Sequence, residues 1–178
     1  MTTTTTDFST LTGTYAIDAS HSRVGFVARH AMVTKVRGSF NEFDGTATID
    51  GADPANSSVR VTLEANSIDT RNQQRDDHIR TNDFLDIASY PQITFVSTAI
   101  GHNGGNDFQV TGDLTIRGVT KSVVLPLEYL GSATDPFGNA RVGFEGSLVI
   151  NRKDWGVNWN AATGVLVSEK VTLKFGVP

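Results

Sequence analysis

The chain has 178 residues, of which 38% are hydrophobic and 19% are charged, with a net charge of -4 and no cysteine. This length suits one domain with a sizeable core, because a domain of this size hides about 70% of its unfolded surface. The lack of cysteine excludes disulfides, thiolate metal sites and cysteine nucleophiles, and the mixed charges without a basic run argue against a nucleic-acid partner.

The N-terminal segment MTTTTTDFSTLTG is rich in threonine. It has neither the basic start nor the apolar stretch of a secretory signal, and no apolar run in the chain approaches the ~18 residues of a membrane span. We therefore predict a disordered leader over residues 1–13, a single domain over residues 14–178, and a cytoplasmic location.

Apolar and polar residues alternate through most of the chain, which predicts β-strands. Val24, Phe26 and His30 share one parity, so His30 is expected to face inward with the two apolar side chains. The same period of two recurs near residues 43–49, 59–65, 93–95, 108–116, 123–129, 142–150 and 171–175. Turn residues in DGADPANS, HNGGND and DPFGNA separate several of these segments.

About eight strands joined mostly by short loops predict an all-β fold, either an antiparallel sandwich or a barrel. Glycines lie inside or beside several of the strand patterns, as in VGF, RGS and VGF again near residue 143. Because glycine permits the sharp coiling that closure of a sheet needs, we favour an extended antiparallel β-barrel. A barrel of this size holds either its own side chains or one small ligand.

One short helix is predicted near residues 71–82, with Asp69 or Thr70 as its N-terminal cap. Its only large apolar side chain is Ile79, so an apolar stripe cannot hold it against the barrel. The charged groups must therefore fix its position.

The charged part of this helix is the block RDDH at residues 75–78. The structural interpretation is that Arg75, Asp76 and His78, with Arg37, form a polar network that holds the helix on the barrel. Adjacent residues on one helical turn cannot all aim at one ion, so no metal site is expected here. No GxSxG motif is present, so nothing indicates a serine hydrolase.

The chain resembles the YceI-like family of polyisoprenoid-binding proteins from Tyr15 to about Phe175. The resemblance is carried by ordered blocks, YAIDASHSRVGFVARH, VRGSFNEFDG, SIDTRNQQRDDHIRTNDFLD, YPQITFVST, GDLTIRGVT and NRKDWGV. It implies a lipocalin-like β-barrel whose elongated apolar interior holds a long isoprenoid chain, with a short helical segment near its mouth.

The apolar stripes have two interpretations, because inward side chains line a barrel whether it is filled by the protein or by a ligand. The stripes alone favour a filled core, in which Trp155 closes the far end, whereas the family resemblance favours a cavity. With the resemblance, we predict contacts to the ligand chain from Val24, Phe26, Val61, Leu63, Phe84, Leu85, Ile93, Phe95, Leu114, Ile116, Leu125, Leu127, Phe144, Leu148 and Trp155.

The head group of the ligand is expected at the mouth, near His30, Arg37, Asp76 and His78. The predicted function is a non-catalytic carrier that sequesters a quinone or prenyl lipid, with no other cofactor. One alternative is an enzyme for an apolar substrate with Asp76, His78 and His30 as acid and base groups. Another is an interaction module with a filled core, dimeric through an exposed strand edge or an apolar barrel surface.

Overall fold

Antiparallel strands form almost the whole structure. The computed structural model describes residues 8–19, 22–30, 34–157 and 170–177. The strands are β1 (Gly13–Ala16), β2 (Arg23–His30), β3 (Thr34–Phe40), β4 (Phe43–Ile49), β5 (Ser58–Glu64), β6 (Ile68–Asp69), β7 (Gln92–Gly104), β8 (Asp107–Ile116), β9 (Val119–Thr134), β10 (Ala140–Asn151) and β11 (Lys170–Val177). The helices are α1 (Gln73–Arg80) and the 3-10 turns η1 (Ser9–Leu11), η2 (Pro54–Asn56), η3 (Ala65–Ser67) and η4 (Arg152–Trp155).

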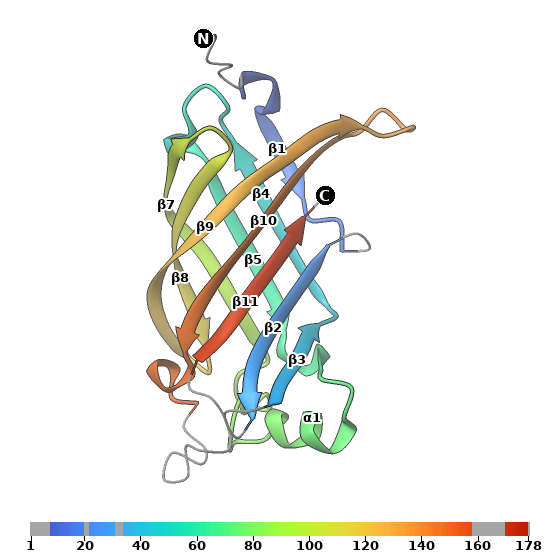
Figure 1. Cartoon of the computed structure of the whole chain (residues 1–178), viewed down its shortest axis with the longest axis vertical. Coiled ribbons are helices and arrows are strands. Elements are labelled where there is room, and N and C mark those ends of the chain that lie inside the picture. The colour runs from blue at the N-terminus through green and yellow to red at the C-terminus, as the bar shows by residue number, and fades with distance from the viewer. Residues whose placement is uncertain (1–7, 20–21, 31–33, 158–169, 178) are drawn as a thin grey trace.

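The strands belong to one sheet that curls into a tube. Its eleven strands lie in the order β1-β4-β5-β7-β8-β9-β10-β11-β2-β3-β6. Strands β3 and β4 stand near opposite ends of this order, yet only Asn41 and Glu42 join them in the chain. The two ends of the sheet must therefore lie side by side, and Figure 1 shows the strands wrapped around the long axis, with η1 at one end and α1 at the other. The predicted lipocalin-like antiparallel barrel is confirmed.

Three strands of the described chain were not expected from the sequence. Strands β1 and β6 have four and two residues, too few to show a period. Strand β3, TKVRGSF, carries mostly polar or small side chains. All three form because longer neighbours offer them a hydrogen-bonding edge: β4 pairs with β1, and β2 pairs with β3, which in turn pairs with β6.

Part of the predicted leader is ordered in the structure. Phe8 and Leu11 are buried with Phe108 and Val142 in a small core cluster at the η1 end of the barrel. The threonine-rich composition suggested disorder, but these two apolar side chains give η1 enough buried surface to pack. Residues 1–7 lie outside the described residues.

Helix α1 is shorter than predicted and has a different cap. The side chain of Asn72, rather than Asp69 or Thr70, accepts the Arg75 backbone N–H at 3.0 Å. Asp69 instead accepts the backbone N–H of Arg71, and this hydrogen bond lowers the pKa of the Asp69 carboxyl. The local sequence offered several side chains able to cap, and only the path of the chain decided among them.

Two phenylalanine rings lie directly over glycines on adjacent strands. A Cβ atom on Gly38 would stand 2.3 Å from the Phe26 ring, and one on Gly112 would stand 2.4 Å from the Phe95 ring and 2.8 Å from the Val96 carbonyl oxygen. The rings occupy space that any other residue would fill, which allows the sheet to coil tightly.

Gly112→Ala should therefore destabilise the barrel. We expect the free energy of unfolding to fall by about 1–3 kcal/mol, because the new methyl group meets both a ring and backbone. Gly101→Ala is the control, since its Cβ would have no neighbour closer than 3.5 Å. Denaturant unfolding of both variants measures the difference, and equal stabilities would contradict this account of the coiling.

Candidate functional site

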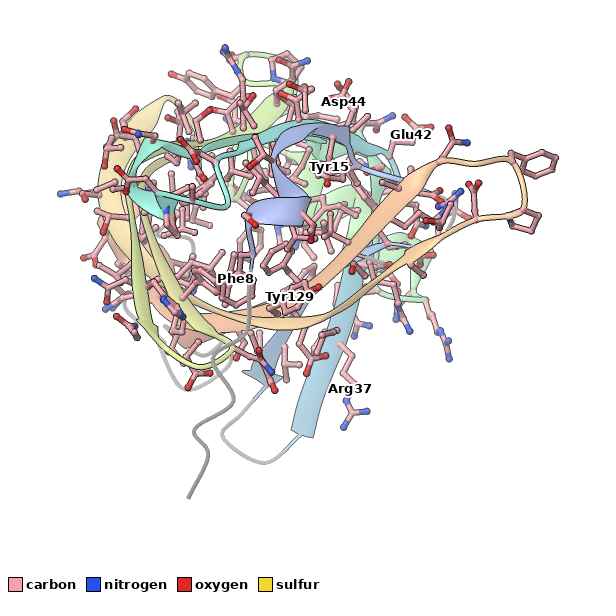
Figure 2. The ribbon with its side chains drawn as sticks, turned by 90° about the horizontal axis from the view of Figure 1, so that it is seen from above. Phe8, Tyr15, Arg37, Glu42, Asp44 and Tyr129 are labelled. Carbon is pink, nitrogen blue, oxygen red and sulfur yellow. The ribbon has the colours of Figure 1, made fainter. Side chains whose placement is uncertain are left out.

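An apolar cavity of about 720 Å³ occupies the barrel at the η1 end. Side chains from strands around the barrel line it, together with Phe8 and Leu11. Figure 2 looks along the barrel from this end and shows Phe8, Tyr15 and Tyr129 gathered within the ring of strands. The predicted contacts to the ligand chain that line this cavity are Val24, Val61, Phe95, Leu125, Leu127 and Phe144.

The other predicted chain contacts pack against one another in the main core cluster. Trp155 is 3% exposed, and its Nε1–H donates to the carbonyl oxygen of Leu114 at 2.9 Å. This packing extends toward the end of the barrel that carries α1 and η4 (Figure 1). The residues of this group are Phe26, Leu63, Phe84, Leu85, Ile93, Leu114, Ile116, Leu148 and Trp155. The predicted chain contacts thus include residues that line the described cavity and others known only as members of the main core cluster.

Asp18 and Arg141, which both line the cavity, form an ion pair at its rim. Arg141 donates from Nη1 to Asp18 at 2.5 Å and from Nε to Asp135 at 3.1 Å. Asp135 also accepts the backbone N–H groups of Phe137 and Asn139, each at 2.9 Å, so it fixes the turn between β9 and β10. These two carboxylates raise the pKa of Arg141 and keep the guanidinium charged.

The sequence does not reveal this rim. Asp18 and Arg141 are 123 positions apart, and each belongs to an ordinary polar segment. The turn motif DPFGNA was recognised, but a turn motif alone does not reveal which distant side chain its neighbours meet.

The residues predicted for the mouth do not line the described cavity. Asp76 and His78 lie on α1, at the opposite end of the barrel from η1 (Figure 1). Arg37 is exposed on β3 and points away from the barrel in Figure 2. His30 ends β2, and its side chain lies outside the described residues. That these residues meet a ligand head group at a mouth beside the helix stays a prediction.

Asp76 and Arg75 instead hold α1 to the segment before it. The Asp76 carboxylate, in a residue that is 6% exposed, accepts the Thr70 backbone N–H at 3.0 Å and the Thr70 hydroxyl at 2.5 Å. Arg75 donates to the Thr70 hydroxyl and carbonyl oxygen, both at 2.7 Å. The structural interpretation of the RDDH block is thus confirmed for these two residues.

His78 makes a separate contact. Its Nε2 lies 2.8 Å from an Asp83 carboxylate oxygen, and its ring packs edge-on against Phe84 with the ring centres 5.2 Å apart. Among the described residues, no group of three or more His, Cys, Asp or Glu side chains could hold a metal ion. Over the same part of the chain, no helix is long and apolar enough to cross a membrane.

The sequence pattern of the YceI-like domain matches residues 15–178. The chain belongs to the YceI-like family. A relative from Escherichia coli called Protein YceI is 42% identical over 151 residues, which is 84% of this chain and 78% of that protein. This YceI-like chain also resembles two solved structures.

Burkholderia cenocepacia BcnA matches with a TM-score of 0.82 and 30% identity, over 90% of this chain and 98% of BcnA. A polyisoprenoid binding domain from Saccharophagus degradans, implicated in plant cell wall breakdown, matches with a TM-score of 0.66 and 19% identity, over 92% and 98% of the two chains. At that identity the second likeness shows the fold alone.

Asp76→Ala should loosen α1 from the barrel. It leaves the Thr70 N–H and hydroxyl without their charged acceptor, and we expect a loss of about 2–3 kcal/mol in the free energy of unfolding. Asp77→Ala is the matched control, because Asp77 is 61% exposed in its ion pair with Arg80 and should cost less than about 1 kcal/mol. Denaturant unfolding checks both values, and equal losses would argue against the Thr70 network.

The contribution of Asp135 to the stability of the protein should depend on pH. Its pKa lies below the ordinary value of 3.8, chiefly because the Asn139 backbone N–H donates to it. A carboxyl with a lowered folded pKa contributes stability above the unfolded pKa and loses this contribution as the pH falls through the folded pKa. Asp135→Asn should therefore be less stable than the natural protein near neutral pH, and the difference should shrink in acid. Unfolding curves at both pH values test this, and a pH-independent difference would contradict it.

Proposed function

We propose that this YceI-like protein is a carrier that binds a long polyisoprenoid lipid, such as a quinone or prenyl derivative, in its barrel cavity. The observation that carries the proposal is the apolar cavity of about 720 Å³ between the strands. Six of the side chains predicted to touch the ligand chain line it, namely Val24, Val61, Phe95, Leu125, Leu127 and Phe144. The polyisoprenoid binding named for the Saccharophagus degradans domain of the same fold supports this choice of ligand.

The chemistry of the cavity favours an apolar guest. Burying one methylene contributes about 0.8 kcal/mol, whereas one neutral hydrogen bond to a head group nets about 1 kcal/mol. A chain of many carbons therefore supplies most of the driving force. At the rim, the Arg141 charge already meets the carboxylates of Asp18 and Asp135, so the main contribution of this rim is to shape the opening.

A non-catalytic role is part of this proposal. The catalytic alternative relied on Asp76, His78 and His30 as acid and base groups. Asp76 is buried against Thr70, and His78 contacts Asp83, both on the side of the molecule away from the described cavity. These two groups are therefore not positioned to exchange protons with a guest held there.

Filling the cavity should displace the lipid. Ala47 lines the cavity on β4, and Thr48 is exposed on the same strand. We expect Ala47→Phe to copurify with at least about tenfold less isoprenoid lipid than the natural protein, because the ring occupies the space of the guest. Thr48→Phe should keep the natural lipid content.

The measurement is solvent extraction followed by mass spectrometry of both purified variants, after circular dichroism has shown that each is folded. Equal lipid content in the two folded variants would place the guest elsewhere. Absence of isoprenoid lipid from the natural protein, even after incubation with a long-tailed polyprenyl quinone, would overturn the proposed function.

A further inference from the structure

The barrel wall is incomplete between β9 and β10. The two strands pair only from Thr134 and Ala140 to Glu128 and Glu145. Along residues 119–127 and 146–151, all of them described, β9 pairs with β8 and β10 pairs with β11, but the two strands do not pair with each other. The ladder thus ends part-way along two long strands.

Pro126 explains where the ladder ends. The Tyr129 backbone N–H donates to Asn106 on the β8 side of the strand. Because backbone groups alternate between the two edges of a strand, position 126 faces β10, where proline has no N–H to donate. Gly146 lies against this point, since a Cβ atom there would stand 2.2 Å from the Pro126 carbonyl oxygen.

Beyond this contact an opening of about 580 Å³ separates the strands. We call it the β9–β10 gap. At its rim, Val124 and Val149 are 52% and 60% exposed, which is unusual for branched apolar side chains on a barrel wall. Its inner lining includes Ile150 and Trp155, both buried in the main core cluster. The gap therefore ends on side chains of the apolar core.

Leu127 stands between the β9–β10 gap and the cavity. Its side chain lines the cavity and packs against both core clusters. Its Cδ2 atom also lies 2.7 Å from the place of a Cβ on Gly146, at the end of the gap next to Pro126. A connection between the two spaces would need this side chain to rotate, and such rotations are among the faster motions of a protein.

We propose that the β9–β10 gap is a side portal through which the isoprenoid chain enters and leaves the barrel, and in which the end of a long chain lies. This inference rests on the proposed function. The gap would add room to the cavity of about 720 Å³ for the end of a chain longer than the cavity holds. The gap offers apolar surface where the remaining methylenes stay out of water.

An isoprenoid chain fits this opening better than an added peptide strand. A peptide strand would need hydrogen-bond partners on both edges, and Pro126 removes a donor at the narrow end. An isoprenoid chain needs only apolar contacts. The gap supplies these from Val123, Val124, Leu148, Val149, Ile150 and Trp155, beside polar side chains that include Lys121, Asn151 and Asp154.

A single-cysteine experiment tests the portal, since the natural chain has no cysteine. Ser147→Cys places a thiol at the β9–β10 gap, and Ala99→Cys places one on the exposed face of β7 as the control. Each variant is labelled with benzophenone maleimide, loaded with a long-tailed polyprenyl quinone, and mixed with phosphatidylcholine vesicles. The transfer rate, the amount of quinone bound at equilibrium and the photo-crosslinked products are measured.

The label at position 147 should slow quinone transfer about tenfold or more and form a quinone adduct, while the label at position 99 does neither. Leu127→Ala, without a label, should speed quinone transfer, because the smaller side chain obstructs less of the path between the gap and the cavity. Equal transfer rates in two labelled proteins that both bind quinone would overturn the portal and leave the proposed function standing. A crosslink from position 147 to a second copy of the chain, with no quinone adduct, would also overturn it. If the natural protein binds no quinone, both proposals fail.

Discussion

Tight coiling of one sheet is the constraint on which the rest of this structure depends. The sheet returns on itself because β3 and β4, far apart in strand order, are joined by only two residues. Such coiling needs places where adjacent strands approach closely. Gly38 and Gly112 provide them, because each leaves room for a ring, Phe26 over Gly38 and Phe95 over Gly112. The same rings line the interior, so the contacts that close the barrel also set what space remains inside it.

The described interior combines packed side chains and a cavity. Trp155 and Phe84, near η4 and α1, are buried in the main core cluster. Toward η1, a cavity remains among side chains that include Ala47, Val59 and Val61. The Tyr15 hydroxyl donates to the Leu11 carbonyl oxygen at 2.8 Å, which ties η1 to β1.

Charged groups in this protein act mainly on its architecture. Asp76 and Arg75 tie α1 to Thr70, and Asp135 and Arg141 tie the β9–β10 turn to Asp18. Each pair satisfies polar groups that would otherwise lose hydrogen bonds on folding. The charged groups of both arrangements have partners. This agrees with an apolar guest that is held by its chain.

The sequence by itself determined the long strands, the parity of their inward side chains and the YceI-like family, because each follows from a period or motif read along a continuous segment. It also indicated that Asp76 and Arg75 serve the position of α1, because Ile79 alone could not. Only the tertiary structure decided that β1, β3 and β6 form, that Asn72 caps the helix, and that Arg141 meets Asp18. It likewise decided that the cavity lies at the η1 end and that the wall opens beyond Pro126. These features depend on which distant strands become neighbours and on how much volume their side chains leave unfilled between them. A pattern read along one continuous segment contains neither.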